Sequence, residues 1–87
     1  IYELINGNGK VKEYNDYNDK LIFEGEYLNG KRNGKGKEYD QDSNLIFEGE
    51  YLNGQRWNGK SIEYDGLGSL MFEDEYINGK KIVNKKV

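Results

Sequence analysis

Paired glutamates are the residues of this 87-residue chain whose type and spacing best suit chemistry. Glu24 and Glu26 lie two residues apart, as do Glu48 and Glu50. On an extended strand each pair falls on one face, where a general acid and a general base could work together. We expect a lysine opposite each glutamate, however, which favours solvent-exposed ion pairs of little individual strength. We therefore interpret these carboxylates as structural and expect no enzyme.

The side chains that other catalytic and metal sites need are missing. The chain has no His, Cys or Thr, and its serines are Ser43, Ser61 and Ser69. This leaves no nucleophile with a neighbouring base and no nitrogen or sulfur metal ligand. Asp40-Gln41-Asp42 starts like a calcium loop but lacks its glycine and distal glutamate, and Gly34-Lys35-Gly36 lacks the setting of a phosphate loop. We expect no catalytic residue, metal or cofactor.

Composition favours a thin β domain. Hydrophobic residues make up 34% of the chain and charged residues 33%, and the apolar set is rich in Tyr, with no Ala. Such a chain favours strands and cannot fill a thick core. The net charge of −3 argues against nucleic acid, and no run approaches the roughly 20 apolar residues of a membrane helix. Without cysteine we expect a cytoplasmic location, and the start at Ile1 without Met or signal peptide suggests a longer parent protein.

Internal repeats organise the sequence. A block reading Leu-Ile-Phe-Glu-Gly-Glu-Tyr-Leu-Asn-Gly recurs unchanged once and altered once, at residues 21–30, 45–54 and 70–79. A second block begins Asn-Gly-Lys and ends Glu-Tyr, at residues 8–14, 33–39 and 58–64. These spacings predict one repeat domain over residues 1–87. Its parts are a partial first repeat at 1–20, repeats at 21–44 and 45–69, and a degenerate cap at 70–87.

The two blocks predict the arms of a β-hairpin around an Asn-Gly pair, which accepts the positive φ angles of a turn. With Asn29 to Arg32 as a loop, the predicted pairs are Tyr27 with Gly34, Gly25 with Gly36, Glu26 with Lys35 and Glu24 with Lys37. With Asn53 to Trp57 as the next loop, they are Tyr51 with Gly59 and Glu50 with Lys60. A two-residue turn at Asn29-Gly30 would shift this register by two residues and keep the same faces.

The predicted fold is all-β, an elongated single-sheet array of stacked antiparallel β-hairpins. One face carries aromatic rings over glycines, and the other carries glutamates and lysines. A lone hairpin is marginally stable, so each unit must bury its rings against the next. We expect about six strands spanning roughly 25–30 Å, joined by polar connectors at 15–20, 40–44 and 65–69.

These blocks resemble the MORN (membrane occupation and recognition nexus) repeat, in its MORN-like variant. The resemblance rests on Phe-Glu-Gly-Glu-Tyr, Asn-Gly and Asn-Gly-Lys-Gly-Lys-Glu-Tyr, and covers about residues 8–87. Tyr27 and Tyr51 stand where many members have Trp, and Asp74 replaces the repeat glycine. The resemblance implies a β-hairpin solenoid that serves as a scaffold or protein-binding module. A contested phosphoinositide-binding role has also been proposed for the family.

The last repeat lacks the second block, and we interpret its end as a cap. The same loop assignment sets Tyr76 opposite Val83 and Phe72 opposite Val87. Lys85 and Lys86 would then discourage pairing at the sheet edge, although they could instead contact lipid phosphates.

Two functional hypotheses remain. In the first, an aromatic face holds an extended peptide or a second copy of the array, through Phe23, Tyr27, Phe47, Tyr51, Phe72 and Tyr76. These rings could equally only stack on one another. Trp57 falls in the inserted loop position, where it is either a binding hot spot or a half-buried anchor. In the second hypothesis, lipid headgroups bind Lys31, Arg32, Lys35 and Lys37, although net acidity and the facing glutamates weigh against this.

Overall fold

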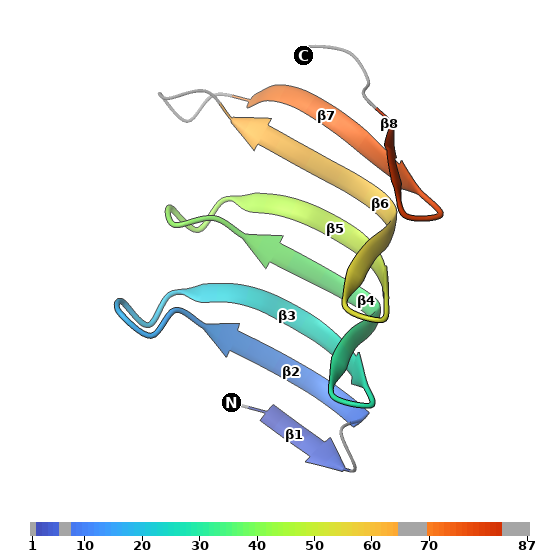
Figure 1. Cartoon of the computed structure of the whole chain (residues 1–87). Helices are drawn as coiled ribbons and strands as arrows, with labels where there is room; N and C mark the ends of the chain where they lie inside the picture. Colours follow the sequence, from blue (N-terminus) through green and yellow to red (C-terminus); the bar gives the residue numbers. More distant parts are fainter. Residues whose placement is uncertain (1, 6–7, 65–69, 83–87) are drawn as a thin grey trace.

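The described strands form one antiparallel sheet whose strand order follows the sequence (Figure 1). The computed structural model describes residues 2–5, 8–64 and 70–82. Its strands are β1 (Tyr2–Ile5), β2 (Asn8–Tyr14), β3 (Leu21–Leu28), β4 (Lys31–Tyr39), β5 (Leu45–Leu52), β6 (Gln55–Tyr64), β7 (Leu70–Ile77) and β8 (Lys80–Ile82). The described residues contain no helix, so the predicted all-β single sheet is confirmed, with eight strands rather than about six. The extents of 41 × 32 × 13 Å are those of a single layer.

Two-residue Asn-Gly turns close the hairpins and lie along one side of the sheet in Figure 1. Asn29 and Gly30 have φ angles of 52° and 78°, and Asn53 and Gly54 have 51° and 87°. Positive φ at both central residues gives the turn a twist that matches the strands. The four- and five-residue loops that we predicted are therefore wrong, because the chain reverses at the Asn-Gly pair itself.

A β-bulge behind each of the first two Asn-Gly turns resets the pairing within the hairpin. In the β3·β4 pair Tyr27 lies opposite Arg32, whereas Gly25 lies opposite Gly36 and Glu24 opposite Lys37, as predicted. The predicted Tyr27–Gly34 and Glu26–Lys35 pairs are wrong, because the bulge falls between Gly25 and Tyr27.

The second hairpin has a different register. The β5·β6 pair sets Gly49 opposite Gly59 and Glu48 opposite Lys60, with Tyr51 opposite Arg56. The predicted Tyr51–Gly59 and Glu50–Lys60 pairs are therefore wrong. Glycine still meets glycine and glutamate still meets lysine, because both blocks alternate with the period of a strand.

The most regular pairing joins neighbouring repeats. The β2·β3, β4·β5 and β6·β7 pairs share one register, which places a tyrosine opposite a glycine of the preceding repeat in Gly9–Tyr27, Gly34–Tyr51 and Gly59–Tyr76. The same register places lysine opposite glutamate in Lys10–Glu26, Lys35–Glu50 and Lys60–Glu75. The predicted kinds of pair therefore occur, but with the preceding repeat as partner.

Glycines leave room on the sheet for the aromatic rings. Phe23 and Phe47 are fully buried, and Tyr51 is 3% exposed. A Cβ added to Gly36 would lie 2.7 Å from Cε1 of Phe23 and 2.9 Å from Cε1 of Tyr51. Any larger residue here would displace both rings, so the predicted arrangement of aromatic rings over glycines is confirmed.

Asparagine side chains tie each turn to the repeat before it. The Oδ1 atoms of Asn8, Asn33 and Asn58 accept hydrogen bonds from the backbone N–H groups of Asn29, Asn53 and Asn78, at 2.8, 3.2 and 3.0 Å. The Gly54 N–H donates to the Arg32 carbonyl at 2.8 Å, and the Gly79 N–H to the Trp57 carbonyl at 2.9 Å. The Asn that opens each second block thus holds the turn of the next hairpin.

Polar connectors occupy residues 15–20 and 40–44, as predicted, while 65–69 lies outside the described residues. In the second connector Oδ1 of Asp40 accepts the N–H groups of Asp42 and Asn44, both at 2.9 Å. Asp40 therefore closes a turn, as an Asx residue does.

The cap differs from its prediction. Tyr76 lies opposite Lys81 rather than Val83, because a two-residue turn again replaces the expected loop. The predicted Phe72–Val87 pair and the predicted roles of Lys85 and Lys86 lie outside the described residues, as Val83 does.

Candidate functional site

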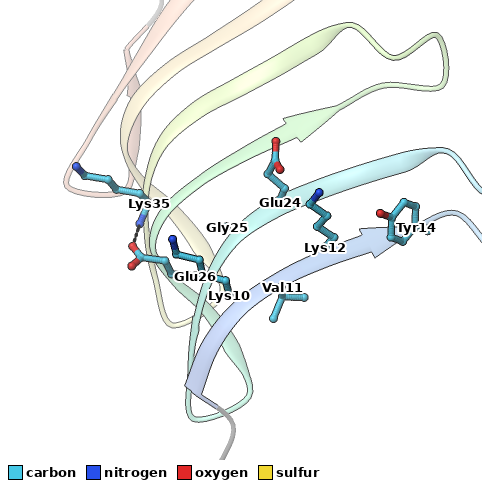
Figure 2. A pocket seen from close by; sticks show the side chains of 8 residues that line it. All are labelled: Lys10, Val11, Lys12, Tyr14, Glu24, Gly25, Glu26 and Lys35. Carbon is cyan, nitrogen blue, oxygen red and sulfur yellow. Dashed lines mark hydrogen bonds between the residues drawn. The ribbon is translucent and has the colours of Figure 1, made fainter. Parts of the chain in front are cut away.

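The registers divide the sheet into two faces, because residues opposite each other across strands share a face. We call the face with Phe23, Phe47 and Tyr51 the inner face, and the face with Glu24 and Lys37 the outer face. In Figure 2 the strands bend so that Val11 points into the bend, whereas Lys12, Glu24 and Lys35 point to its outer side.

The inner face carries a three-residue unit twice, each time built from two repeats. In the first unit the Tyr27 hydroxyl donates to Oε2 of Glu13 at 2.7 Å, and Nε and Nη2 of Arg32 donate to the two Glu13 oxygens at 2.9 and 3.0 Å. In the second, Tyr51 and Arg56 bind Glu38 in the same way at 2.6, 2.9 and 3.0 Å. We call these the Tyr–Glu–Arg units.

The arginines also cover the aromatic rings. The Arg32 guanidinium lies 4.2 Å from the centroid of the Phe23 ring, and that of Arg56 lies 4.8 Å from the centroid of Phe47. Nη1 of Arg32 is also 3.6 Å from Oε1 of Glu38, which links the two units. Burial of the rings in a single-layer sheet thus depends on these charged side chains as well as on neighbouring rings.

The electrostatics of the units hold their carboxylates ionised. Burial by itself would raise the pKa of Glu38, but hydrogen bonds from Arg56 and Tyr51 outweigh it and hold the pKa below its ordinary value of 4.5. The pKa of Glu13 is lowered in the same way by Arg32 and Tyr27. Burial and the hydrogen bond to Glu13 raise the pKa of the Tyr27 hydroxyl to about 12. The units are fixed ion pairs rather than proton-transfer groups at neutral pH.

A third version of the unit, built from different residues, lies in the hairpin of β7 and β8. Lys81 lies opposite Tyr76 as Arg56 lies opposite Tyr51, and its Nζ is 3.2 Å from Oε1 of Glu63 and 3.4 Å from Oδ2 of Asp74. The hydrogen bond with Glu63 raises the pKa of Lys81.

Beside this third version a polar pair replaces two glycines. Ser61 lies opposite Asp74 where the previous boundary has Gly36 opposite Gly49, and both polar side chains are buried. Oγ of Ser61 has no hydrogen-bond partner in the described part of the chain. The last boundary between repeats is thus chemically distinct from the first two.

The outer face carries a row of alternating charge. Successive registers place Lys12, Glu24, Lys37, Glu48, Lys60 and Glu75 opposite one another from β2 to β7. Nζ of Lys37 is 3.6 Å from Oε2 of Glu48, and the Tyr39 hydroxyl donates to Glu24 at 3.1 Å. The glutamates that suggested acid–base chemistry therefore alternate with lysines, which supports the ion-pair interpretation.

A shallow pocket lies on this face near the first repeat (Figure 2). Lys10, Lys12, Glu24, Glu26 and Lys35 line it together with Val11, Tyr14 and Gly25. Glu26 accepts a hydrogen bond at 2.8 Å from the backbone N–H of Lys35, which is the dashed line in Figure 2. Charges of both signs line the pocket, so it has no strong preference for an anion.

The structure brings most of the predicted aromatic residues together, but it buries them. Phe23, Phe47 and Tyr51 form the core cluster, and Tyr27 and Tyr76 pack against it partly buried. The Phe23 and Tyr51 rings meet edge to face with centroids 5.2 Å apart. The side chain of Phe72 lies outside the described part. These contacts favour the alternative in which the rings stack on one another, because little ring surface remains for a partner.

Trp57 lies apart from this cluster. It is the extra residue between Arg56 and Asn58 in β6, where the second hairpin has its bulge. A Cβ added to Gly79 would lie 2.7 Å from Cζ3 of Trp57, so the indole packs on the turn of the next hairpin. Its side chain is of intermediate burial, which supports the half-buried anchor over the binding hot spot.

The four residues of the predicted lipid site lie on two faces. Lys31, Lys35 and Lys37 belong to the outer face, whereas Arg32 lies on the inner face between Glu13 and Glu38. Lys35 lies opposite Glu50 and Lys37 opposite Glu48. The structure therefore does not gather these cations into one site.

Sequence reasoning missed the carboxylates and one arginine of the inner face, Glu13, Glu38 and Arg56. A signal was present, because a glutamate precedes the final tyrosine of every second block and an arginine follows the turn of both complete repeats. The asparagines that hold the turns were likewise read only as part of a repeated Asn-Gly-Lys.

Among the described residues, no helix has the length and apolar character that crossing a bilayer requires.

Comparison with known proteins identifies the repeat. A search of curated proteins and a search of solved structures each returned no match. The family model of the MORN repeat matches residues 23–45 and 47–57, which hold Phe23, Arg32, Glu38 and Tyr51. The chain therefore contains MORN repeats over these residues.

Proposed function

We propose that this chain is a non-catalytic scaffold module of a longer protein, and that the module binds a protein or peptide partner. MORN repeats are usually modules for protein or membrane interactions. Between these two roles, the observation that supports a protein partner is the placement of the cations. Arg32 is bound by two carboxylates on the inner face, and Lys35 and Lys37 lie opposite glutamates on the outer face.

A phosphate group would have to displace these carboxylates to reach the cations. Three of the four proposed lipid ligands are already next to an anion of the chain, and the chain as a whole carries a net charge of −3. Both features oppose attraction to an anionic membrane surface. The outer face also leaves aliphatic side chains exposed, including Leu28 and Leu52, which supports a protein partner.

Two measurements on the purified chain test this function. Flotation with phosphatidylcholine vesicles, with and without phosphoinositide, should show no phosphoinositide-dependent binding. The immobilised chain should retain a protein from a cell extract that a blank matrix does not retain. Phosphoinositide-dependent flotation that weakens steeply with salt, and that Lys31→Glu abolishes while the control Lys60→Glu does not, would refute the proposal.

A further inference from the structure

The third version of the Tyr–Glu–Arg unit has no arginine. In the two complete units the oxygens of Glu13 and of Glu38 each accept three hydrogen bonds, two of them from one guanidinium. In the third version Lys81 supplies a single ammonium, 3.2 Å from Oε1 of Glu63. Oε2 of Glu63 accepts no hydrogen bond from any of the described residues. The Glu63 side chain is 54% exposed, so a ligand can reach this oxygen.

A buried hydroxyl without a partner lies beside Glu63. Ser61 precedes Glu63 by two residues on β6, so the two side chains share the inner face and are about 6.8 Å apart along the strand. Ser61 is 4% exposed, and its Oγ has no hydrogen-bond partner in the part of the chain that the structure describes. A buried polar group in this state is costly, and a bound donor would remove that cost.

Both groups line one open pocket of about 530 Å³. The other charged residues that line it are Asp40, Asp42, Arg56 and Lys81. The two cations are already bound by carboxylates of the chain, Arg56 by Glu38 and Lys81 by Glu63. The carboxylates of the connector between β4 and β5 therefore leave the pocket with a surplus of negative charge, which attracts a cationic ligand.

We infer that this pocket binds an arginine side chain of the partner protein, which completes the third unit from outside. Arg32 and Arg56 already bind carboxylates of this face through two guanidinium nitrogens each. A guanidinium holds five N–H donors in a fixed fork, so it can donate to Oε2 of Glu63 and to the Ser61 hydroxyl at the same time. This inference rests on the proposed function and names the residue by which the partner is anchored.

Other ligands suit the pocket less well. An anion would have to displace Glu63 from Lys81 or Glu38 from Arg56. A metal ion needs several ligands around one point, and the described residues contain no group of three or more acidic side chains placed to hold one. A lysine would bring the charge, but its compact ammonium does not match two acceptors so far apart.

An NMR titration of the ¹⁵N-labelled chain with Nα-acetyl-arginine N-methylamide tests the inference. The amide signals of Ser61, Glu63 and Lys81 should shift together and saturate, with a Kd on the order of 1 mM for so small a ligand. The citrulline analogue keeps the shape without the charge, and the lysine analogue keeps the charge without the fork. Both should bind at least about fivefold more weakly, and a lysine analogue that binds as tightly as the arginine compound would overturn the inference.

A matched pair of glutamates separates the site from general electrostatics. Glu63→Gln should weaken binding of the arginine compound at least about fivefold. Glu48→Gln should leave it unchanged, although Glu48 is also paired with one lysine and its side chain is 56% exposed. Equal effects of the two substitutions would show that net charge, and not this pocket, attracts the ligand, and would overturn the inference.

Two further variants should weaken binding while they stabilise the chain. Lys81→Arg keeps the charge and supplies the missing fork from within, so it should block the pocket and raise the urea midpoint. Ser61→Ala removes a buried hydroxyl that has no partner, so it should also raise the midpoint, while the ligand loses an acceptor. Weaker binding by a more stable chain cannot come from a loss of folding. Full binding by both variants would overturn the inference.

The outcome is distinct from that of the proposed function. If the arginine compound gives no saturable shifts while the immobilised chain still retains a protein from the extract, the arginine pocket is refuted and the scaffold function stands. If the chain retains no protein and floats with phosphoinositide vesicles, the scaffold function itself is refuted.

Discussion

Glu38 should be among the most important polar residues for stability, and Glu38→Gln tests this. Its carboxylate accepts the Tyr51 hydroxyl at 2.6 Å and two Arg56 nitrogens at 2.9 and 3.0 Å. It also lies 3.6 Å from Arg32. Glutamine has nearly the same shape, but it loses the charge and turns an N–H₂ group toward a guanidinium that can only donate.

The magnitude follows from the number of charged partners and their burial. Hydrogen bonds to charged groups contribute about 1.5–3 kcal/mol each, and breaking a buried ion pair costs about 3–5 kcal/mol. The Glu38 and Arg56 side chains are 18% and 25% exposed, so water can solvate the groups that lose their partner and reduces the cost. We expect the free energy of unfolding to fall by about 2–3 kcal/mol, which lowers Tm by roughly 10–20 °C in a domain of this size.

Urea unfolding followed by Trp57 fluorescence measures the loss, because Trp57 is the single tryptophan of the chain. The matched control is Glu48→Gln on the outer face, where the carboxylate side chain is 56% exposed and its pair with Lys37 spans 3.6 Å. Exposed pairs contribute less than about 1 kcal/mol, so this control should change little. A loss for Glu38→Gln no larger than that of Glu48→Gln would refute our account of the inner face.

Three further outcomes follow from the same structure. Gly36→Ala should cost more than about 2 kcal/mol in thermal unfolding, because the new methyl group lies 2.7 Å from the Phe23 ring, whereas Gly30→Ala meets open space and should cost about 1 kcal/mol for its positive φ. The inner-face carboxylates have folded-state pKa values below 4.5, so the unfolded chain binds more protons in acid. The urea midpoint should therefore fall as the pH drops from about 5 through those lowered values, and a midpoint constant down to pH 3 would contradict this. Asn33→Ala should speed amide hydrogen exchange at Asn53, whose N–H it releases, at a cost of about 1 kcal/mol.

The repeat pattern was enough to predict the elements, but not which strands share the regular register. Gly25 opposite Gly36 was predictable from the alternation of glycine with charge. The partner of Tyr27 was not, because a bulge of unknown size follows the turn and moves its glycine partner from Gly34 to Gly9. A period of two accepts any even shift, so pattern alone leaves such choices open.

The functional surfaces were predictable in part. The aromatic residues were identified, but their exposure was not, because burial of Phe23 depends on Arg32 folding back over its ring. Arg32 was grouped with lysines on the basis of charge, while its position beside the bulge puts it on the inner face with Glu13. The leucines before the turns stood out only once their exposure was known.

The sequence by itself determined that this chain is a repeat array of β-hairpins, because blocks with strand periodicity recur around Asn-Gly turns. It also determined the two faces, since side chains alternate along a strand whatever its partner is. Only the tertiary structure decided which repeat supplies each partner, that Glu38 binds Tyr51 and Arg56, and that Trp57 packs on the next turn. These contacts join residues of different repeats, and their geometry depends on bulges and turns that set the offset between strands.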